Sequence, residues 1–201
     1  MKLMSVLAII FGVYANATPA KIEAGKYAID PAHTKIGFEI SHLVISTVDG
    51  RFDQYTGDVE MGKTVDDTKL NATLQVASIN TGNGDRDKHL KGPDFFNAEQ
   101  FPTITFKSTK ITGKADALKI TGDLTLHGVT KSVTLDGKYM GVVNDPFGNT
   151  KVAFVARGKL SRKDFGLTWS KTIEAGPVVG DEVVLSLNVE AGKPIAKTAG
   201  K

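Results

Sequence analysis

The chain has 201 residues, a formal net charge of +3 and no Cys. The absence of Cys excludes disulfide bonds and thiol chemistry, so an exported chain of this composition must be stable through its hydrophobic core alone. The positive charges are spread over alternate positions rather than clustered, which argues against a nucleic-acid-binding protein.

Residues 1–20 have the pattern of a secretory signal peptide. Lys2 supplies a positive charge, residues 3–14 are apolar with one exception, and small residues follow. We expect cleavage after Ala17 or Ala20 and export to the periplasm. The apolar run is shorter than the roughly 20 residues that span a bilayer. No Cys follows it as a lipid anchor, so we expect a soluble mature chain without integral membrane association.

About 180 residues follow this segment, enough for one domain. They alternate apolar and polar residues with a period of two, as half-buried β-strands do. The predicted strands lie at residues 36–40, 52–61, 70–76, 104–106, 118–126, 133–139, 152–160 and 183–189. The turns between them are short, which favours antiparallel neighbours. Eight such strands favour an up-and-down barrel, so we predict an all-β, eight-stranded antiparallel barrel.

The alternation alone does not say which face of the barrel is apolar. Aromatic residues make up 7% of the chain, with a single Trp, so the aromatic girdles of an outer-membrane barrel are missing. We therefore expect the apolar faces to point inward. Small residues in the later strands, Gly122, Gly137, Ala156 and Gly158, can leave empty volume for one ligand. Alternatively, these glycines relieve strand coiling and bulges.

The alternation stops between residues 80 and 106. Glycines there permit a loop, and Asp85 can cap a short helix over residues 86–90. This lid-like segment combines ionisable and aromatic side chains, which suits a ligand with a polar head and an apolar body: Arg86, Asp87, Lys88, His89, Phe95, Phe96 and Phe101. The alternative is that the three Phe residues only anchor a long surface loop on the core.

Ordered blocks along the chain resemble the YceI family of exported lipid-binding proteins. The blocks are residues 30–33 (DPAH), 38–43 (FEISHL), 50–52 (GRF), 78–83 (SINTGN), 86–90 (RDKHL), 94–96 (DFF), 101–104 (FPTI), 122–131 (GDLTLHGVTK), 145–148 (DPFG), 164–169 (DFGLTW) and 179–183 (VGDEV). The resemblance covers residues 21–191. Phe147 stands where many relatives carry Trp, and residues 192–201, which we expect to form a flexible tail, have no counterpart.

The resemblance implies an extended, lipocalin-like barrel of eight antiparallel strands with a long amphiphile in its tunnel. The implied ligand is a polyisoprenoid or isoprenoid quinone, and some members of the family are linked to fatty-acid amides. We therefore expect an exported binding protein for carriage, storage or sequestration of such a lipid. The family supplies no established catalytic residue, so none is carried over. We also predict no metal site and no cofactor besides the bound lipid, and leave a homodimer open.

We predict a polar mouth at Arg86, Asp87 and His89. The apolar tunnel is predicted to be lined by Phe38, Ile40, Phe52, Leu74, Val76, Phe95, Phe96, Phe101, Phe106, Leu124, Leu135, Tyr139, Phe154 and Trp169. Trp169 and Phe165 are expected to plug one end of the barrel.

An enzyme that acts on an isoprenoid or amide-headed lipid is the alternative function. The side chains that could build a general base or a metal site are His33, His42, His89, His127, Asp87 and Asp123. No two His have helical i, i+4 spacing, and Ser78 and Ser170 lack a nucleophile elbow. His127, just before a glycine, is expected to stabilise a turn. A turnover assay separates the two hypotheses, because a carrier returns its cargo unchanged.

Overall fold

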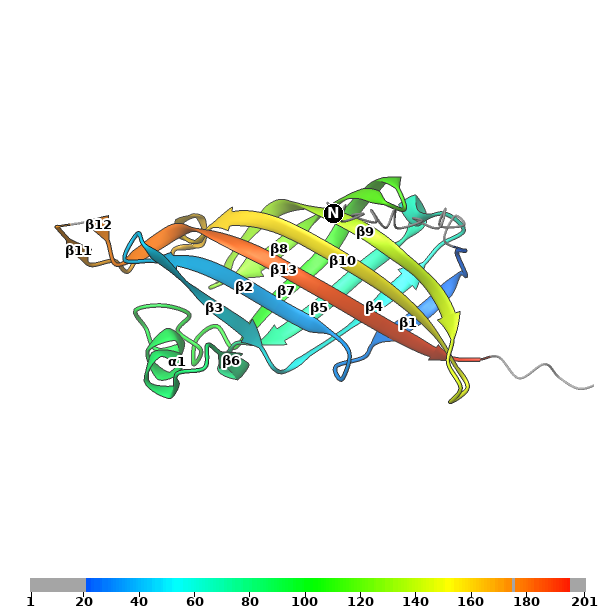
Figure 1. Ribbon diagram of the computed structural model, residues 1–201, viewed down its shortest axis with the longest axis horizontal. Helices are drawn as coiled ribbons and strands as arrows, with labels where there is room; N and C mark the ends of the chain where they lie inside the picture. The colour runs from blue at the N-terminus through cyan, green and yellow to red at the C-terminus, as the bar shows by residue number, and fades with distance from the viewer. Residues whose placement is uncertain (1–20, 175, 196–201) are drawn as a thin grey trace, which may run out of the picture.

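The computed structural model describes residues 21–174 and 176–195 (Figure 1). The predicted signal peptide, with both of its candidate cleavage sites, lies outside the described residues. Within the described ranges, no helix is both long enough and apolar enough to cross a bilayer.

The structure is built almost entirely from strands. The strands are β1 (Gly25–Ile29), β2 (Lys35–His42), β3 (Ser46–Phe52), β4 (Tyr55–Met61), β5 (Lys69–Gln75), β6 (Ile79–Asn80), β7 (Thr103–Lys114), β8 (Ala117–Leu126), β9 (Val129–Asn144), β10 (Asn149–Ser161), β11 (Thr172–Ile173), β12 (Gly176–Pro177) and β13 (Val179–Pro194). The helical elements are α1 (Gly84–Lys91) and the 3-10 turns η1 (Val65–Asp67), η2 (Val76–Ser78) and η3 (Arg162–Phe165).

Eight strands close into an antiparallel barrel in the order β1, β4, β5, β7, β8, β9, β10 and β13. The ring closes where β1 pairs with β13, with Ala28 opposite Gly192 and Ile29 opposite Ala191. The eight-stranded barrel predicted from the alternation is therefore confirmed. Strand β13 continues to Pro194, so residues 192–194 belong to the barrel wall, and placing the start of a tail at residue 192 was wrong.

The N-terminal strands are split into two pairs, because β1 and β4 belong to the ring whereas β2 and β3 form a hairpin that pairs with β13. The sequence did not indicate this split. β13 pairs with β1 at one end of the barrel and with β2 along the rest of its length. β3 follows β2 as a hairpin and pairs on its other side only at Arg51 and Phe52, with β6. The strand predicted over residues 52–61 is confirmed as β4 from Tyr55 onward, but its start was wrong, because Phe52 ends β3 and Asp53 and Gln54 separate β3 from β4.

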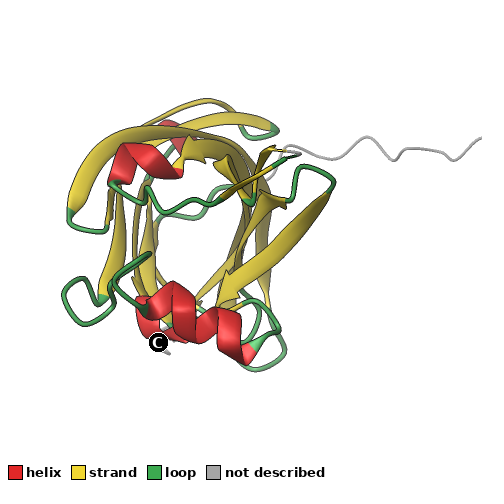
Figure 2. Cartoon of the chain, turned by 90° about the vertical axis from the view of Figure 1, so that its left-hand side faces the viewer, coloured by secondary structure: helices red, strands yellow, loops and turns green. Residues whose placement is uncertain are grey.

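The split gives the barrel two different ends. We call the end where β1 and β4 complete the ring the closed end. The opposite end carries the β2–β3 turn, α1 and η3, and we call it the mouth end; Figure 2 views the molecule from this side, with α1 lying along the rim. Residues 76–102, between β5 and β7, cross at the mouth end and contain α1.

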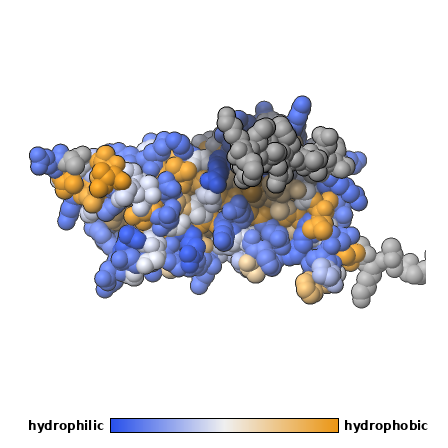
Figure 3. All heavy atoms as spheres, in the orientation of Figure 1, coloured by the Kyte–Doolittle hydropathy of each residue, from blue (hydrophilic) through white to orange (hydrophobic). Residues whose placement is uncertain are grey.

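Apolar side chains point into the barrel and form two clusters. The closed-end core includes Tyr27, Leu118 and Tyr139, which are at most 2% exposed. The second cluster lies toward the mouth and includes Ile104 and Phe165. Polar residues of the same strands point outward, and polar surface covers much of the barrel wall (Figure 3). The predicted inward orientation of the apolar face is confirmed.

The inward glycines do not leave empty volume. A Cβ atom on Gly122 would lie 2.5 Å from the Phe106 ring, and one on Gly137 would lie 2.6 Å from Ile120 Cδ1. The glycines instead make room for large side chains on the neighbouring strands. The expectation that they create the ligand space is therefore wrong.

Candidate functional site

A cavity of about 370 Å³ lies inside the barrel, between the closed-end core and the mouth end. Its floor is formed by side chains such as Phe154, Leu135 and Ile120, and its wall by apolar residues of the barrel strands. Toward the mouth end, the lining continues to Trp169 and Val178. The volume falls within the range of small-molecule sites, about 300–1,000 Å³.

Eleven of the fourteen residues predicted for the tunnel lie on this cavity. They are Phe38, Ile40, Phe52, Leu74, Phe95, Phe96, Phe106, Leu124, Leu135, Phe154 and Trp169. The wall also contains residues that the prediction did not name, including Ile36, Ala72, Val133, Leu185 and Leu187. These follow the same inward phase of their strands, so the alternation contained the signal for them.

The other three predicted residues lie elsewhere. Tyr139 packs below the cavity floor, 5.0 Å from the Phe154 ring, and donates a hydrogen bond to the Lys21 carbonyl at 2.9 Å. Phe101 packs against His127 with ring centroids 4.6 Å apart. Val76 begins η2 and is 1% exposed in the core. The structure therefore gives each of these side chains a packing position away from the cavity.

Helix α1 places Arg86 on the cavity. The helix is capped by Asn83, whose side chain accepts a hydrogen bond from the Arg86 amide at 3.0 Å. The predicted cap, Asp85, is therefore wrong, and the helix begins two residues earlier than the predicted residue 86. Arg86 Nε and Nη2 donate to the hydroxyl and carbonyl oxygens of Thr81 at 2.7 and 2.8 Å.

Asp87 fixes the same threonine from the other side. Its Oδ1 accepts hydrogen bonds from the Thr81 amide at 2.9 Å and the Thr81 hydroxyl at 2.6 Å. Asp87 itself does not reach the cavity, whereas Thr81 and Arg86 do. Within the described part of the chain, Arg86 makes no ion pair with a carboxylate. A guanidinium has five N–H donors, so Arg86 keeps donors for a polar group in the cavity.

His89 joins α1 to the opposite rim of the mouth. Its Nε2 lies 2.9 Å from Asp94 Oδ2, and its ring packs edge-on against Phe95 and Trp169 at 5.0 and 5.4 Å. Phe95 and Trp169 are themselves 5.0 Å apart. Trp169 therefore helps to close the mouth end, whereas Phe165 is 1% exposed within the mouth-side core.

Arg162 is a site residue that the sequence analysis missed. Its side chain is 3% exposed and donates to the carbonyl oxygens of Gly180, Leu167 and Trp169 at 2.8, 2.6 and 2.7 Å. Burial lowers the pKa of Arg162, and nearby Asp181 opposes that shift. The arginine thus fixes the loop that carries Trp169. Its position in phase with inward Leu160 was the signal that could have identified it.

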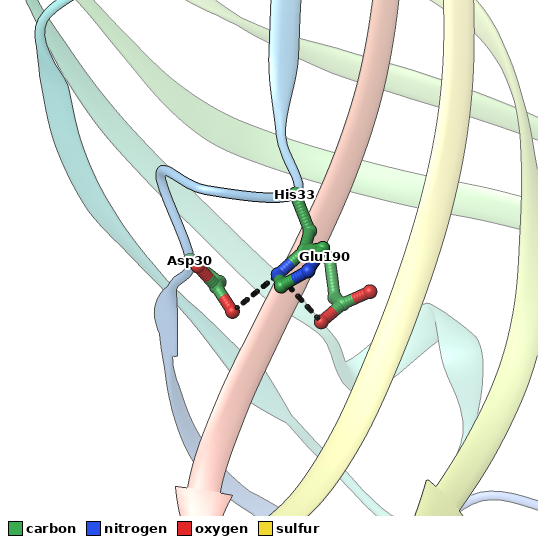
Figure 4. Close-up of side chains that lie close together, drawn as sticks. All are labelled: Asp30, His33 and Glu190. Atoms are coloured by element: carbon green, nitrogen blue, oxygen red, sulfur yellow. Dashed lines mark hydrogen bonds and ion pairs between the residues drawn. The ribbon is translucent and has the colours of Figure 1, made fainter.

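Among the described residues, Asp30, His33 and Glu190 form the one group with metal-ligand spacing (Figure 4), and none of the three lines the cavity. His33 Nδ1 is 3.0 Å from Asp30 Oδ2 and 3.7 Å from Glu190 Oε1. Lys151 Nζ lies 2.6 and 3.2 Å from the same two carboxylates. Hydrogen bonds from Lys151 and then His33 hold the pKa of Asp30 well below its usual range.

Lys151 already pairs with both carboxylates that a metal ion would need, so we assign these four residues a structural role. They lie where β13 changes its neighbour from β2 to β1. The remaining histidines are dispersed: His42 lines the mouth side of the cavity, and His127 Nδ1 lies 3.2 Å from the Phe165 carbonyl oxygen. Apart from Asp30, His33 and Glu190, no residues in the described ranges form a group with metal-ligand geometry.

The sequence and the fold are similar to those of known proteins. Residues 27–191 match the model of the YceI-like domain. The chain is 39% identical over 176 residues to Protein YceI of Salmonella newport, covering 86% of this chain and 90% of that protein. Its structure is similar to that of the Campylobacter jejuni YCEI protein, with a TM-score of 0.64 and 37% identity over 82% of this chain and 95% of that one.

A more distant structure shares the fold alone. It is a polyisoprenoid binding domain from Saccharophagus degradans, with a TM-score of 0.62 and 16% sequence identity. The match covers 84% of this chain and 98% of that domain.

Proposed function

The chain belongs to the YceI family, and we propose that it holds a long-chain amphiphile of the polyisoprenoid or isoprenoid-quinone type inside its barrel. The observation that carries this proposal is the cavity of about 370 Å³ with an almost wholly apolar wall. The polyisoprenoid binding domain of Saccharophagus degradans, which has the same fold, supports the choice of ligand class.

The apolar lining of the cavity, which continues to Trp169 and Val178 at the mouth end, suits an apolar ligand chain that enters from there. Each buried methylene contributes roughly 0.8 kcal/mol before the cost of ordering the chain. The floor at Phe154 and Leu135 limits how deep the chain can reach. The apolar chain of the ligand therefore supplies most of the affinity, and the polar head of the ligand remains at the mouth.

Arg86 is the group that we propose to orient the head. Thr81 holds its guanidinium in place through two hydrogen bonds, so little side-chain freedom is lost on binding. Its remaining N–H groups suit an anionic or carbonyl-bearing head. His89 also lines the cavity and packs on Trp169, which supports an aromatic contact with the start of the ligand's apolar chain.

We propose carriage, storage or sequestration without chemical change of the ligand, in the periplasm, to which the N-terminal pattern points. In the described part of the chain, Asp30, His33 and Glu190 lie off the cavity wall, and of the His89–Asp94 pair only His89 reaches it, at the mouth end. This separation favours a binding protein over an enzyme. A turnover assay on the bound lipid tests it, because a carrier releases the lipid unchanged.

The proposal is tested by identifying the lipid and by filling the cavity. Mass spectrometry of lipid extracted from the protein, purified from its native compartment, should detect a long-chain amphiphile. Ala72→Phe should lower the affinity for a long-chain isoprenoid quinone by about two orders of magnitude, because the added ring displaces several methylenes. Ala72 lines the cavity.

Thr73→Phe is the matched control, because it adds the same side chain to the outer face of β5. It should leave the affinity for the quinone unchanged. If the folded Ala72→Phe protein binds the quinone as tightly as the parent does, the ligand does not lie in the barrel.

A further inference from the structure

Three exposed aliphatic side chains protrude at the mouth end. Val44 and Ile45, in the β2–β3 turn, are 57% and 87% exposed, and Ile173 of β11 is 44% exposed. We call Val44, Ile45 and Ile173 the apolar tip. Figure 3 shows hydrophobic atoms at the left-hand end, where Figure 1 places β11 and β12.

The two hairpins that carry the apolar tip contact each other. The Leu43 amide donates a hydrogen bond to the Val178 carbonyl at 2.9 Å. Val44 packs closely on Gly176: a Cβ atom added to Gly176 would lie only 3.1 Å from Val44 Cγ2. The apolar tip is therefore a surface built by two segments distant in the sequence.

The apolar tip is continuous with the cavity wall. Ile40 and Val48 precede and follow the β2–β3 turn, and Val178 and Val179 follow β12; all four line the cavity. Residues 41–48 contain no Asp, Glu, Lys or Arg. The β2–β3 turn therefore has no charged residue between the apolar tip and its cavity-lining positions Ile40 and Val48.

The backbone of the turn is costly for its residues. Leu43 and Val44 have φ angles of +53° and +68°, in the left-handed region that Gly and Asn adopt readily and that a β-branched residue disfavours. A hairpin selected for stability alone would carry Asn-Gly at such positions. Strain of this kind is typical of ligand-contacting segments.

We propose that the apolar tip docks on the surface of a lipid bilayer, so that the ligand moves between the bilayer and the cavity without crossing water. The proposal rests on the proposed function, because an isoprenoid-like ligand resides in a bilayer. Three aliphatic side chains offer at most a few hundred Å², well below the roughly 800 Å² per partner of a stable protein interface. They suffice for shallow insertion into lipid.

Docking should depend on apolar insertion rather than on lipid charge. The charged residues that flank β11, Lys171 and Glu174, have opposite signs. These two residues therefore add no net charge beside the apolar tip, and α1 at the rim carries both acidic and basic residues, so apolar insertion rather than attraction to anionic headgroups is expected to dominate. We expect docking on vesicles of pure phosphatidylcholine, with little change in affinity between low and high salt.

Trp169 provides the readout, because it is the single Trp of the chain and lines the cavity at the mouth end. Vesicles of brominated phosphatidylcholine should quench the fluorescence of the ligand-free protein, and unbrominated vesicles should not. The variant Val44→Asn/Ile45→Ser/Ile173→Ser should lose affinity for the vesicles by a factor of roughly ten or more. Asn at position 44 tolerates the positive φ angle, so the turn is preserved.

The matched control removes exposed apolar side chains from the other end of the barrel. Val143 and Phe147 are 63% and 86% exposed near the β9–β10 turn, and Val143→Ser/Phe147→Ser should dock as the parent does. Absence of quenching in the parent, or equal binding by the apolar-tip variant, would overturn bilayer docking; the first result would point to a protein partner. Equal losses in both variants would overturn the assignment to the mouth end.

Transfer of a ligand to the protein from two different sources distinguishes a failure of this inference from a failure of the proposed function. A long-chain isoprenoid quinone is offered either from detergent solution or from phosphatidylcholine vesicles. The apolar-tip variant should bind the quinone normally from detergent and extract it from vesicles roughly tenfold more slowly. Extraction at the parent's rate contradicts docking. A parent that docks on vesicles yet binds no quinone from either source contradicts the proposed function and leaves docking standing.

Discussion

The two ends of the barrel differ in how their side chains are packed. At the closed end, Tyr27, Leu118 and Tyr139 are almost fully buried, and the tyrosine hydroxyls donate to the Glu23 and Lys21 carbonyl oxygens. At the mouth end, β2 and β3 separate from the ring, and the rim is completed by α1 and by the loop that Arg162 holds. Nearly complete burial of large side chains marks the first region, and a ligand-sized apolar cavity marks the second.

The comparison shows how one repeating strand pattern supports both regions. Inward glycines in β8 and β9 admit Phe106 and Ile120 from neighbouring strands, so these positions are filled rather than open. The cavity arises instead where the strands diverge and where an insert replaces direct strand pairing. Stability should therefore depend on the closed end, and ligand binding on the mouth end.

The strongest test of this division is a cavity-creating substitution at the closed end. Leu118 is 1% exposed and does not line the cavity. Leu118→Ala should lower the free energy of unfolding by about 2–5 kcal/mol, from lost transfer energy and the void left behind. Chemical denaturation measures this loss, and the affinity of the folded variant for an isoprenoid quinone should not change.

Lys119→Ala is the control on the outer face of the same strand. Lys119 pairs with Asp136 at the surface, and such pairs contribute about 0–1 kcal/mol. If Lys119→Ala destabilises the protein as much as Leu118→Ala, or if Leu118→Ala abolishes quinone binding, stability and binding are not divided between the two ends.

The barrel itself could be predicted because a period of two records which side of each strand is buried. Ile120 and Leu124 alternate with Lys119 and Asp123, and the structure places the first pair inside. The same rule loses force where a strand ends. Val76 keeps the inward phase but begins η2, and Tyr139 keeps it but lies below the cavity floor, since the period carries no information about depth along the barrel.

Other features depend on contacts between distant segments. The break between β3 and β4 places Asp53 where its carboxylate accepts from Arg51 at 2.6 Å and from Asn80 at 2.7 Å, a contact that joins residues far apart in the sequence. The role of Arg162 likewise requires the carbonyl oxygens of a later loop and of β13. Local patterns could not reveal either one, and only the inward phase of Arg162 hinted at its burial.

A second test addresses the mouth end alone. Arg86→Ala should weaken a lipid with an anionic head by about 1.5–3 kcal/mol, the value of one charge-assisted hydrogen bond, and leave a neutral-headed lipid of equal chain length nearly unaffected. The free energy of unfolding should change little, because Asp87 still holds Thr81. Titration of both lipids against the variant measures the difference.

Lys88→Ala is the matched control for that test. Lys88 lies on the same helix, is exposed and does not line the cavity, so its removal should affect neither lipid. If Arg86→Ala leaves both lipids unaffected, the head group is bound elsewhere on the wall, and His42, which also lines the mouth side, becomes the next position to test.

The smallest expected effect concerns the junction between the two regions, where Asp30, His33, Lys151 and Glu190 secure β13 as it passes from β2 to β1. The Asp30 and Lys151 side chains are about one-fifth exposed, so Asp30→Asn should lower the free energy of unfolding by about 1.5 kcal/mol at neutral pH.

The folded-state pKa of Asp30 lies below its ordinary value of 3.8. The folded protein therefore binds fewer protons there than the unfolded chain, and this stabilisation is present above pH 3.8 and lost as the pH falls below it. Denaturation curves of parent and variant should accordingly differ at pH 7 and converge in acid. A constant difference at both pH values would mean that packing, rather than the charge of Asp30, joins the closed end to the mouth end.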